Sequence, residues 1–391
     1  MPVRAGLPAT VATVLALGLT ATAMAPALAD TPAAAATETS ASRPDAKALR
    51  AAIAGLPDAD ATAALVRVSG RNGTWRGSSG VHDLVTWRKA DPDARFRAGS
   101  TTKVVTAAVV LQLAAEGEVD LGAPVQRYLP RLFAPNAKAF REPISVRQLL
   151  NHSSGLRPGR SLGTNFAESY AHRFETLQPQ EVAASSIAKG PAHAPGTRQE
   201  YLGINYTLLG LLIEKVTGHT YESEATRRVL RPAGMRHSSF PGTDRHIHGP
   251  HNRGYQAVPK PGGGTRLVDV TEWVQRDRFA GGDMISTTAD LERLTFRLFS
   301  GQIVPKPQLE EMFTVPSHIE GATMSAGLMR YRAPDGRIVW VKTGSRHGYS
   351  SVVAATRDLS TVLVYSVNST DAKGEDRNPV AQRIVDAALR G

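Results

Sequence analysis

The sequence of 391 residues contains no cysteine. This absence excludes disulfides, cysteine-ligated zinc, iron–sulfur clusters and a cysteine nucleophile. A glycine-rich phosphate loop following a strand is also missing, which argues against nucleotide use and leaves no cofactor indicated. No internal repeat is present. With 41% hydrophobic residues, the chain is long enough to form one or two domains stabilised by their own core.

Long apolar runs are absent beyond the N-terminal region, so no permanent membrane span is expected. Residues 1–29 resemble a signal peptide, with Arg4, an Ala/Val/Leu-rich stretch and the small residues Ala27 and Ala29 on either side of Leu28, just before Asp30. Residues 30–44 are low in complexity and predict a disordered leader. We therefore expect a secreted, extracellular protein of the cell envelope.

Basic residues exceed acidic ones, 46 to 35, for a net charge of +11. They are scattered, and aromatic residues make up only 6% of the chain. Nucleic-acid binders usually show basic patches with interleaved aromatic residues, so no nucleic-acid partner is expected. For an exported protein, the anionic cell envelope is the more consistent partner.

Strand and helix patterns are distributed unevenly along the chain. The alternation of apolar residues predicts strands at 63–68, 74–81, 336–341, 349–355 and 361–367. Helices are expected at 45–56, after Ser100, at 181–189, 205–217 and 379–389, and residues 121–278 read as helix and loop. These patterns predict an α/β fold whose antiparallel sheet is built from both ends of the chain and flanked by helices. One domain, 45–391, would comprise a sheet lobe (45–118 and 283–391) and an inserted helical lobe (119–282).

Ser100 and Lys103 stand at the start of a long apolar helix pattern. Three positions apart, they share one helical face, so the amine can accept the hydroxyl proton without a histidine. A serine N-cap beside a surface lysine would give the same letters. Ser186–Lys189 repeats the spacing, but it runs into Gly190-Pro191, where a helix stops. Other motifs must decide the matter.

Two further segments could complete a site with Ser100. Tyr201 lies at a loop-to-helix junction, where a nearby lysine would favour its phenolate as a base. Lys342 and Thr343 end a strand pattern and could hold a substrate carboxylate, while Gly344 allows close approach and the Ser345 amide could stabilise an oxyanion. The alternatives are a packed tyrosine and an edge lysine.

Two other patterns carry less weight. Gly159–Gly163 matches a Gly-x-Ser-x-Gly elbow, but no strand precedes it, so we interpret it as a loop. His246, His248 and His251 lie in a Gly/Pro-rich segment where only Asp244 could join them, which favours a polar loop over a metal site.

Read together, the segments Phe96–Lys103, Tyr201–Gly210 and Lys342–Gly344 resemble the serine β-lactamase and penicillin-binding protein superfamily. Class C β-lactamases and secreted D-alanyl-D-alanine carboxypeptidases are the most similar branch. The supporting stretches are Leu149–Leu156 and Ala280–Thr287. The resemblance covers roughly residues 50–390 and implies the β-lactamase/transpeptidase-like fold.

The resemblance implies a role for each motif. Ser100 would be acylated, Lys103 would take or relay its proton, and Tyr201 would assist as base and acid. The amides of Ser100 and Ser345 would form the oxyanion hole. Lys342 and Thr343, with Gly344, would bind the substrate carboxylate. Gly203 departs from the family, which usually has asparagine there to hold the substrate's amide carbonyl. Asn205, two residues later, should point in a different direction on the helix.

A secreted serine hydrolase is therefore expected, most consistent with a D-alanyl-D-alanine carboxypeptidase acting on peptidoglycan peptides. β-Lactams would be inhibitors or substrates. An esterase, a D-amino-acid amidase or peptidase, or a β-lactamase remains an alternative on the same fold, because Gly203 alters acyl recognition. A catalytically weak penicillin-sensing or envelope-binding module is the alternative from another class.

Overall fold

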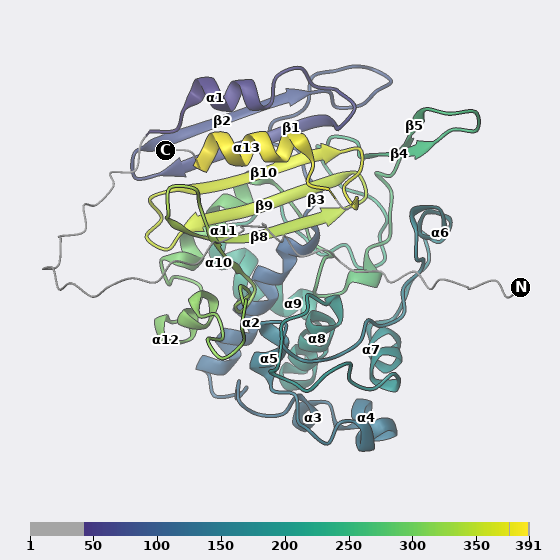
Figure 1. Ribbon diagram of the computed structural model, residues 1–391, viewed down its shortest axis with the longest axis vertical. Coiled ribbons are helices and arrows are strands. Elements are labelled where there is room, and N and C mark those ends of the chain that lie inside the picture. Colours follow the sequence, from purple (N-terminus) through teal and green to yellow (C-terminus); the bar gives the residue numbers. More distant parts are fainter. Residues whose placement is uncertain (1–42, 375, 390–391) are drawn as a thin grey trace, which may run out of the picture.

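The computed structural model describes residues 43–374 and 376–389. A six-stranded antiparallel sheet has the order β2-β1-β10-β9-β8-β7, so strands from both ends of the described chain lie side by side (Figure 1). Its strands are β1 (Ala61–Gly70), β2 (Gly73–Gly80), β7 (Met329–Arg332), β8 (Ile338–Arg346), β9 (Tyr349–Thr356) and β10 (Val362–Ser369). This arrangement confirms the expected fold class.

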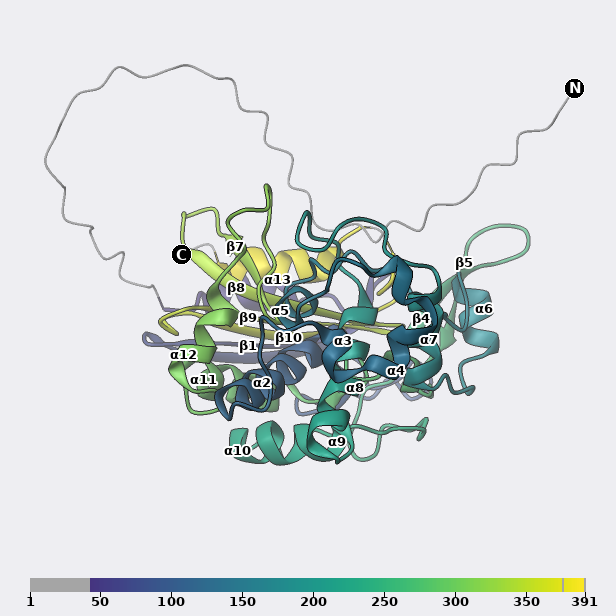
Figure 2. The ribbon, with the colours of Figure 1, turned by 90° about the horizontal axis from the view of Figure 1, so that it is seen from below.

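Helices cover both faces of the sheet. On one face, α1 (Ala46–Ala52) and α13 (Pro379–Leu389) pack together over residues such as Val352 and Leu363. The other face bears Val353 and Val364 and is covered by α11 (Thr288–Phe299). Figure 2 shows α13 and α11 on opposite sides of the strands. Successive side chains of a strand point to opposite faces, which explains why neighbours in β9 and β10 belong to different cores.

Most of the remaining helices lie below the sheet in Figure 1. These are α3 (Val125–Tyr128), α4 (Pro130–Phe133), α5 (Val146–Leu150), α6 (Phe166–Ala171), α7 (Pro179–Ala188), α8 (Gly203–Thr217), α9 (Tyr221–Ala225), α10 (Arg231–Ala233) and α12 (Lys306–Leu309). The 14-residue α2 (Thr102–Ala115) packs against α8, α9 and α12. Eleven of its residues are buried, which agrees with its nearly uniform apolar pattern.

Several sequence-based expectations need correction. The segment 121–278 is not only helix and loop, because β4 (Tyr255–Pro259) and β5 (Thr265–Asp269) form a hairpin in it. The strand expected at 336–341 continues to Arg346, since pairing with β9 extends through the Lys-Thr-Gly run. Ser100 lies in a 3-10 turn, Gly99–Thr101, and α2 begins only at Thr102. Two short strands, β3 (Phe96–Arg97) and β6 (Ile285–Ser286), were not expected.

Most of the N-terminal residues assigned from the sequence lie outside the part of the chain that the structure describes. The signal peptide (1–29) and nearly all of the leader (30–44) lie outside the described residues. Among the residues that are described, no helix combines the length and apolar character needed to cross a membrane. The residue limits given for the two lobes remain a prediction.

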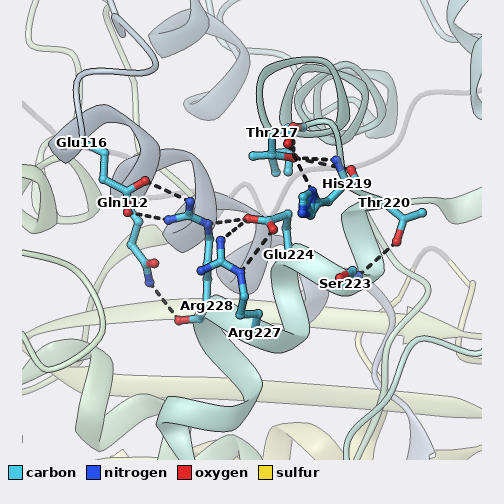
Figure 3. A network of polar contacts seen from close by, with 10 residues as sticks. Gln112, Glu116, Thr217, His219, Thr220, Ser223, Glu224, Arg227 and Arg228 are labelled. Carbon is cyan, nitrogen blue, oxygen red and sulfur yellow. Dashed lines mark hydrogen bonds and ion pairs between the residues drawn. The ribbon is translucent and has the colours of Figure 1, made fainter.

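An ionic network around the buried Glu224 holds the far end of α2 (Figure 3). The Glu224 side chain is only 1% exposed and accepts hydrogen bonds from Arg227 and Arg228. Arg228 also binds Glu116 just after α2, and its carbonyl accepts a hydrogen bond from Gln112. The network therefore ties the segment after α9 to the helix that begins beside Ser100.

Replacing Arg228 with Met should lower the free energy of unfolding by about 3 kcal/mol, because buried Glu224 loses one of its two cations. Urea denaturation of the variant measures this loss. Arg227→Met is the matched control, since the Arg227 side chain is 57% exposed and should contribute much less. Equal losses in the two variants would contradict the assigned role of Arg228.

Candidate active site

The turn carrying Ser100 is pressed against strand β8. A Cβ added to Gly344 would lie 2.0 Å from the Ala98 carbonyl oxygen, and one added to Gly99 would lie 2.5 Å from the Ser345 nitrogen. Gly99 also has a φ of +55°, which side chains other than glycine disfavour. Both glycines are therefore required by close backbone approach, and they bring the backbone of Ser345 beside the residue preceding Ser100.

Lys103 is 2% exposed and points back from the first turn of α2 to the half-buried Ser100. Its Nζ donates to the Ser100 Oγ at 3.3 Å and to the Gly281 carbonyl oxygen. Burial, followed by repulsion from Lys342, lowers the pKa of this amine, while Tyr201 opposes that shift. The amine is thus placed to exchange a proton with the Ser100 hydroxyl.

Tyr201 lies between the two lysines of the motifs. Lys103 Nζ lies 5.3 Å and Lys342 Nζ 4.8 Å from the centre of its ring. Its phenol oxygen is buried and has no hydrogen-bond partner of standard geometry among the described residues. Burial alone would raise the phenol pKa, but the positive charges of Lys103 and Lys342 outweigh it and bring the pKa to about 7. A phenolate is therefore accessible near neutral pH.

The Lys342–Ser345 segment occupies the part of β8 that extends past β7. Strand β7 pairs only with Ile338–Val341, which leaves the edge from Lys342 onward free of it. Lys342 is 8% exposed and lies on the same face of the sheet as Trp340. The next residue, Thr343, is exposed and lies on the opposite face. Lys342 Nζ donates to the Thr343 carbonyl oxygen at 2.8 Å.

Gly203 begins α8 and is exposed. An added Cβ would meet nothing within 4 Å, so the position opens onto free space. Asn205 is fully buried and turned away, with its amide on His152 Nδ1 at 3.1 Å and its oxygen on the Ser154 hydroxyl at 2.6 Å. As expected, Asn205 does not replace the side chain missing at Gly203.

Two residues near the centre were not singled out individually from the sequence. The His152 ring packs at a tilt against that of Tyr201, with ring centres 4.5 Å apart, and burial together with Lys103 and Lys342 lowers its pKa far below the usual value. Gly281 supplies the carbonyl that holds Lys103. Both belong to the supporting stretches of the family resemblance, which was the only sequence signal for them.

The competing motifs have other partners. The Ser186 hydroxyl donates to the Arg157 carbonyl, and Lys189 Nζ donates to the Pro158 carbonyl at 2.7 Å. Ser161 is exposed in a loop with no strand before it. His246 and His248 bind Asp244, and no group of three potential ligands arranged for a metal ion occurs in the described part of the chain.

A comparison with protein families agrees with this arrangement. The model described as Beta-lactamase matches residues 49–387. The chain belongs to the beta-lactamase family. Members of this family are serine hydrolases, and the fold and the assembled motifs are consistent with that activity. The assignment to the class C branch stays a prediction.

Relatives within the family differ in how much of their length is matched. The chain is 25% identical over 310 residues to "Putative penicillin-binding protein PbpX" of Bacillus subtilis (strain 168), covering 78% of this chain and 70% of that protein. It is 31% identical over 214 residues to "Protein flp" of Staphylococcus aureus (strain COL), covering 54% of this chain and only 40% of that protein.

Solved structures provide more complete matches. A D-stereospecific amidohydrolase from Streptomyces sp. has a TM-score of 0.75 and 30% identity, covering 89% of this chain and 99% of that one. The D-amino acid amidase of Ochrobactrum anthropi SV3, complexed with D-phenylalanine, has a TM-score of 0.70 and 26% identity, with coverages of 87% and 98%. Both structures share the fold of this serine hydrolase.

The rate of Ser100 acylation should rise with pH through about 7, because Tyr201 acts as a base only when its phenol is deprotonated. Lys342→Met should move this rise to higher pH, since removing a positive charge raises the pKa of Tyr201. Tyr201→Phe should abolish the rise. Stopped-flow acylation by a chromogenic ester between pH 5 and 9 measures the pH profile of the unmodified protein and of both variants.

Lys260→Met provides the control for this series, because Lys260 is exposed in the β4–β5 hairpin turn. Its profile should coincide with that of the unmodified protein. A rise that stays at the same pH in Lys342→Met would contradict the electrostatic explanation.

Proposed function

We propose that this serine hydrolase is a D-alanyl-D-alanine carboxypeptidase that acts on peptidoglycan peptides through an acyl-enzyme at Ser100. The observation that carries the proposal is the position of Lys342, whose cation lies beside Tyr201 on the free edge of β8. A leaving residue with a free carboxylate would be held there, next to the phenol that must protonate its amine.

The reaction divides into two balanced steps. In acylation, the Ser100 Oγ attacks the scissile carbonyl carbon, and its proton passes to Tyr201 or Lys103. The C–N bond then breaks, and the same proton is delivered to the leaving amine. In deacylation, a water molecule gives up its proton to the same base and attacks the acyl carbon, which releases the acid and restores the serine hydroxyl. The backbone amides of Ser100 and Ser345 would stabilise the oxyanion in both steps.

A D-amino-acid amidase is the second candidate, and Gly203 is the observation that favours it. The family's usual asparagine is absent, so the space beside the α8 terminus is open, and no side chain there holds a peptide carbonyl. A substrate with a shorter acyl portion would lose less by this absence. The matches to a D-stereospecific amidohydrolase and a D-amino acid amidase support the same candidate.

A matched pair of substrates separates these candidates. N-acetylated D-Ala-D-Ala and its C-terminal amide differ only in the leaving group's carboxylate. The carboxypeptidase proposal predicts a higher kcat/KM for the free acid, and Lys342→Met should lower that value by about tenfold or more while affecting the amide less. A preference for the amide, unchanged in Lys342→Met, would favour the amidase. The absence of any turnover or acyl-enzyme would indicate a catalytically weak envelope-binding module.

The effect of Gly203 can be tested in the same assay. Gly203→Asn should raise kcat/KM for N-acetylated D-Ala-D-Ala, because the introduced amide can donate to the acyl carbonyl and the position has room for it. Gly203→Ala is the control, since it adds bulk without a donor. Equal changes in both variants would contradict a role in carbonyl recognition.

We also propose that the protein is secreted after cleavage between Ala29 and Asp30. The basic start, apolar stretch and small residues of positions 1–29 support this proposal. Expression in a bacterial host followed by N-terminal sequencing of the extracellular protein tests it. A first residue of Asp30 is expected, and retention of the intact chain inside the cells would overturn the proposal.

A further inference from the structure

Strand β8 offers a free edge with a cation at each end. Lys342 and Arg346 lie four residues apart on the same face, a separation of roughly 13 Å at about 3.3 Å per residue. The Gly99–Thr101 turn meets the strand between them, at Gly344 and Ser345. A peptide bound along this edge with its carboxylate at Lys342 would therefore pass Ser100 and extend its acyl portion toward Arg346.

At the Arg346 end, two cations are paired with one carboxylate, and a third, Lys373, interacts with that carboxylate electrostatically. Asp277 contacts Arg346 at 3.5 Å through one oxygen and Arg278 at 3.0 Å through the other. Arg346 is nearly buried, whereas half of the Arg278 side chain is exposed. The third cation, Lys373, is exposed in the loop after β10 and has no carboxylate within ion-pair distance among the described residues.

Packing places this cluster beside the nucleophile. The Arg278 Cβ would lie 3.3 Å from a Cβ added to Gly282, and the same position is 3.7 Å from the Gly99 carbonyl carbon. Lys373 is positioned by its neighbour Ala372, whose carbonyl accepts a hydrogen bond from the Ser345 hydroxyl. Asp371 in that loop is engaged by Gln256 at 3.1 Å. The cluster therefore borders the site directly.

The charges of the cluster do not cancel. Three cations and Asp277 leave an excess of two positive charges. Arg278 and Arg346 repel the Lys373 amine. An anionic group brought against Arg278 and Lys373 would relieve this repulsion.

We propose that Arg278 and Lys373, supported by Arg346, form a subsite for a carboxylate on the acyl portion of the substrate. The substrate class is then an acyl donor with an acidic group upstream of the scissile bond, in addition to any carboxylate on the leaving residue. The direction of the peptide along β8 rests on the proposed function, but the charge preference itself concerns only the acyl portion.

The test uses two thioesters, N-acetyl-Glu-D-Ala and N-acetyl-Gln-D-Ala, which are nearly isosteric and differ in charge. The unmodified protein should acylate with the Glu donor about twofold to fivefold faster in kcat/KM, as for one partly exposed charge interaction. Lys373→Met should reduce this ratio, and Lys373→Glu should reverse it. The ratio should also shrink between 50 mM and 500 mM salt because ions screen exposed charges.

Lys260→Glu is the matched control, because it makes the same change of charge on an exposed lysine of the β4–β5 hairpin turn. Its Glu/Gln ratio should equal that of the unmodified protein. Equal rates with both thioesters, or a ratio that Lys373→Glu leaves unchanged, would overturn the subsite.

The corresponding peptides, ending in D-Ala-D-Ala, test the proposed function separately. Charge-selective thioester acylation without peptide cleavage would keep the subsite and reject the carboxypeptidase. Peptide cleavage without charge selectivity would keep the carboxypeptidase and reject the subsite.

Discussion

The burial of the Lys103 amine is the constraint on which the site depends. An ammonium group taken out of water is unstable unless it is paired, hydrogen-bonded or deprotonated. Here the amine binds the Ser100 hydroxyl and the Gly281 carbonyl and lies against the rings of Tyr201 and Tyr206. These partners come from segments far apart in the sequence, so the site exists only when α2, α8 and the loop before β6 are assembled.

The same constraint accounts for the electrostatics around Ser100. Two lysines near one phenol lower its pKa despite burial. Burial keeps the neighbouring His152 neutral by lowering its pKa, and the two lysines add to this effect. A neutral His152 can accept hydrogen bonds from the Leu202 amide and the Asn205 side chain, which fixes the start of α8 and hence Tyr201. Lys342 and Arg346 place positive charge at both ends of the free edge of β8, so this edge favours anionic groups on a bound substrate.

Much of this site could be predicted from the sequence, because its parts are marked by short patterns. Ser100 with Lys103, Tyr201 and Lys342 were all found in this way, and the structure brings them together. The 3-10 turn at Ser100 could not be predicted, since it arises from the close packing of Gly99 on Ser345. The β4–β5 hairpin was missed because Gly262–Gly264 and the prolines around it resemble an ordinary loop. Arg278 and Lys373 carry no motif, and only tertiary packing places them beside Ser100.

The central claim is that the surrounding lysines hold the Tyr201 phenol close to deprotonation. Ultraviolet difference titration of the unmodified protein against Tyr201→Phe observes that phenol directly, independently of any substrate. The account predicts one extra tyrosine ionising with a pKa of about 7. A difference spectrum that shows ionisation only near the ordinary tyrosine pKa of about 10 would contradict it.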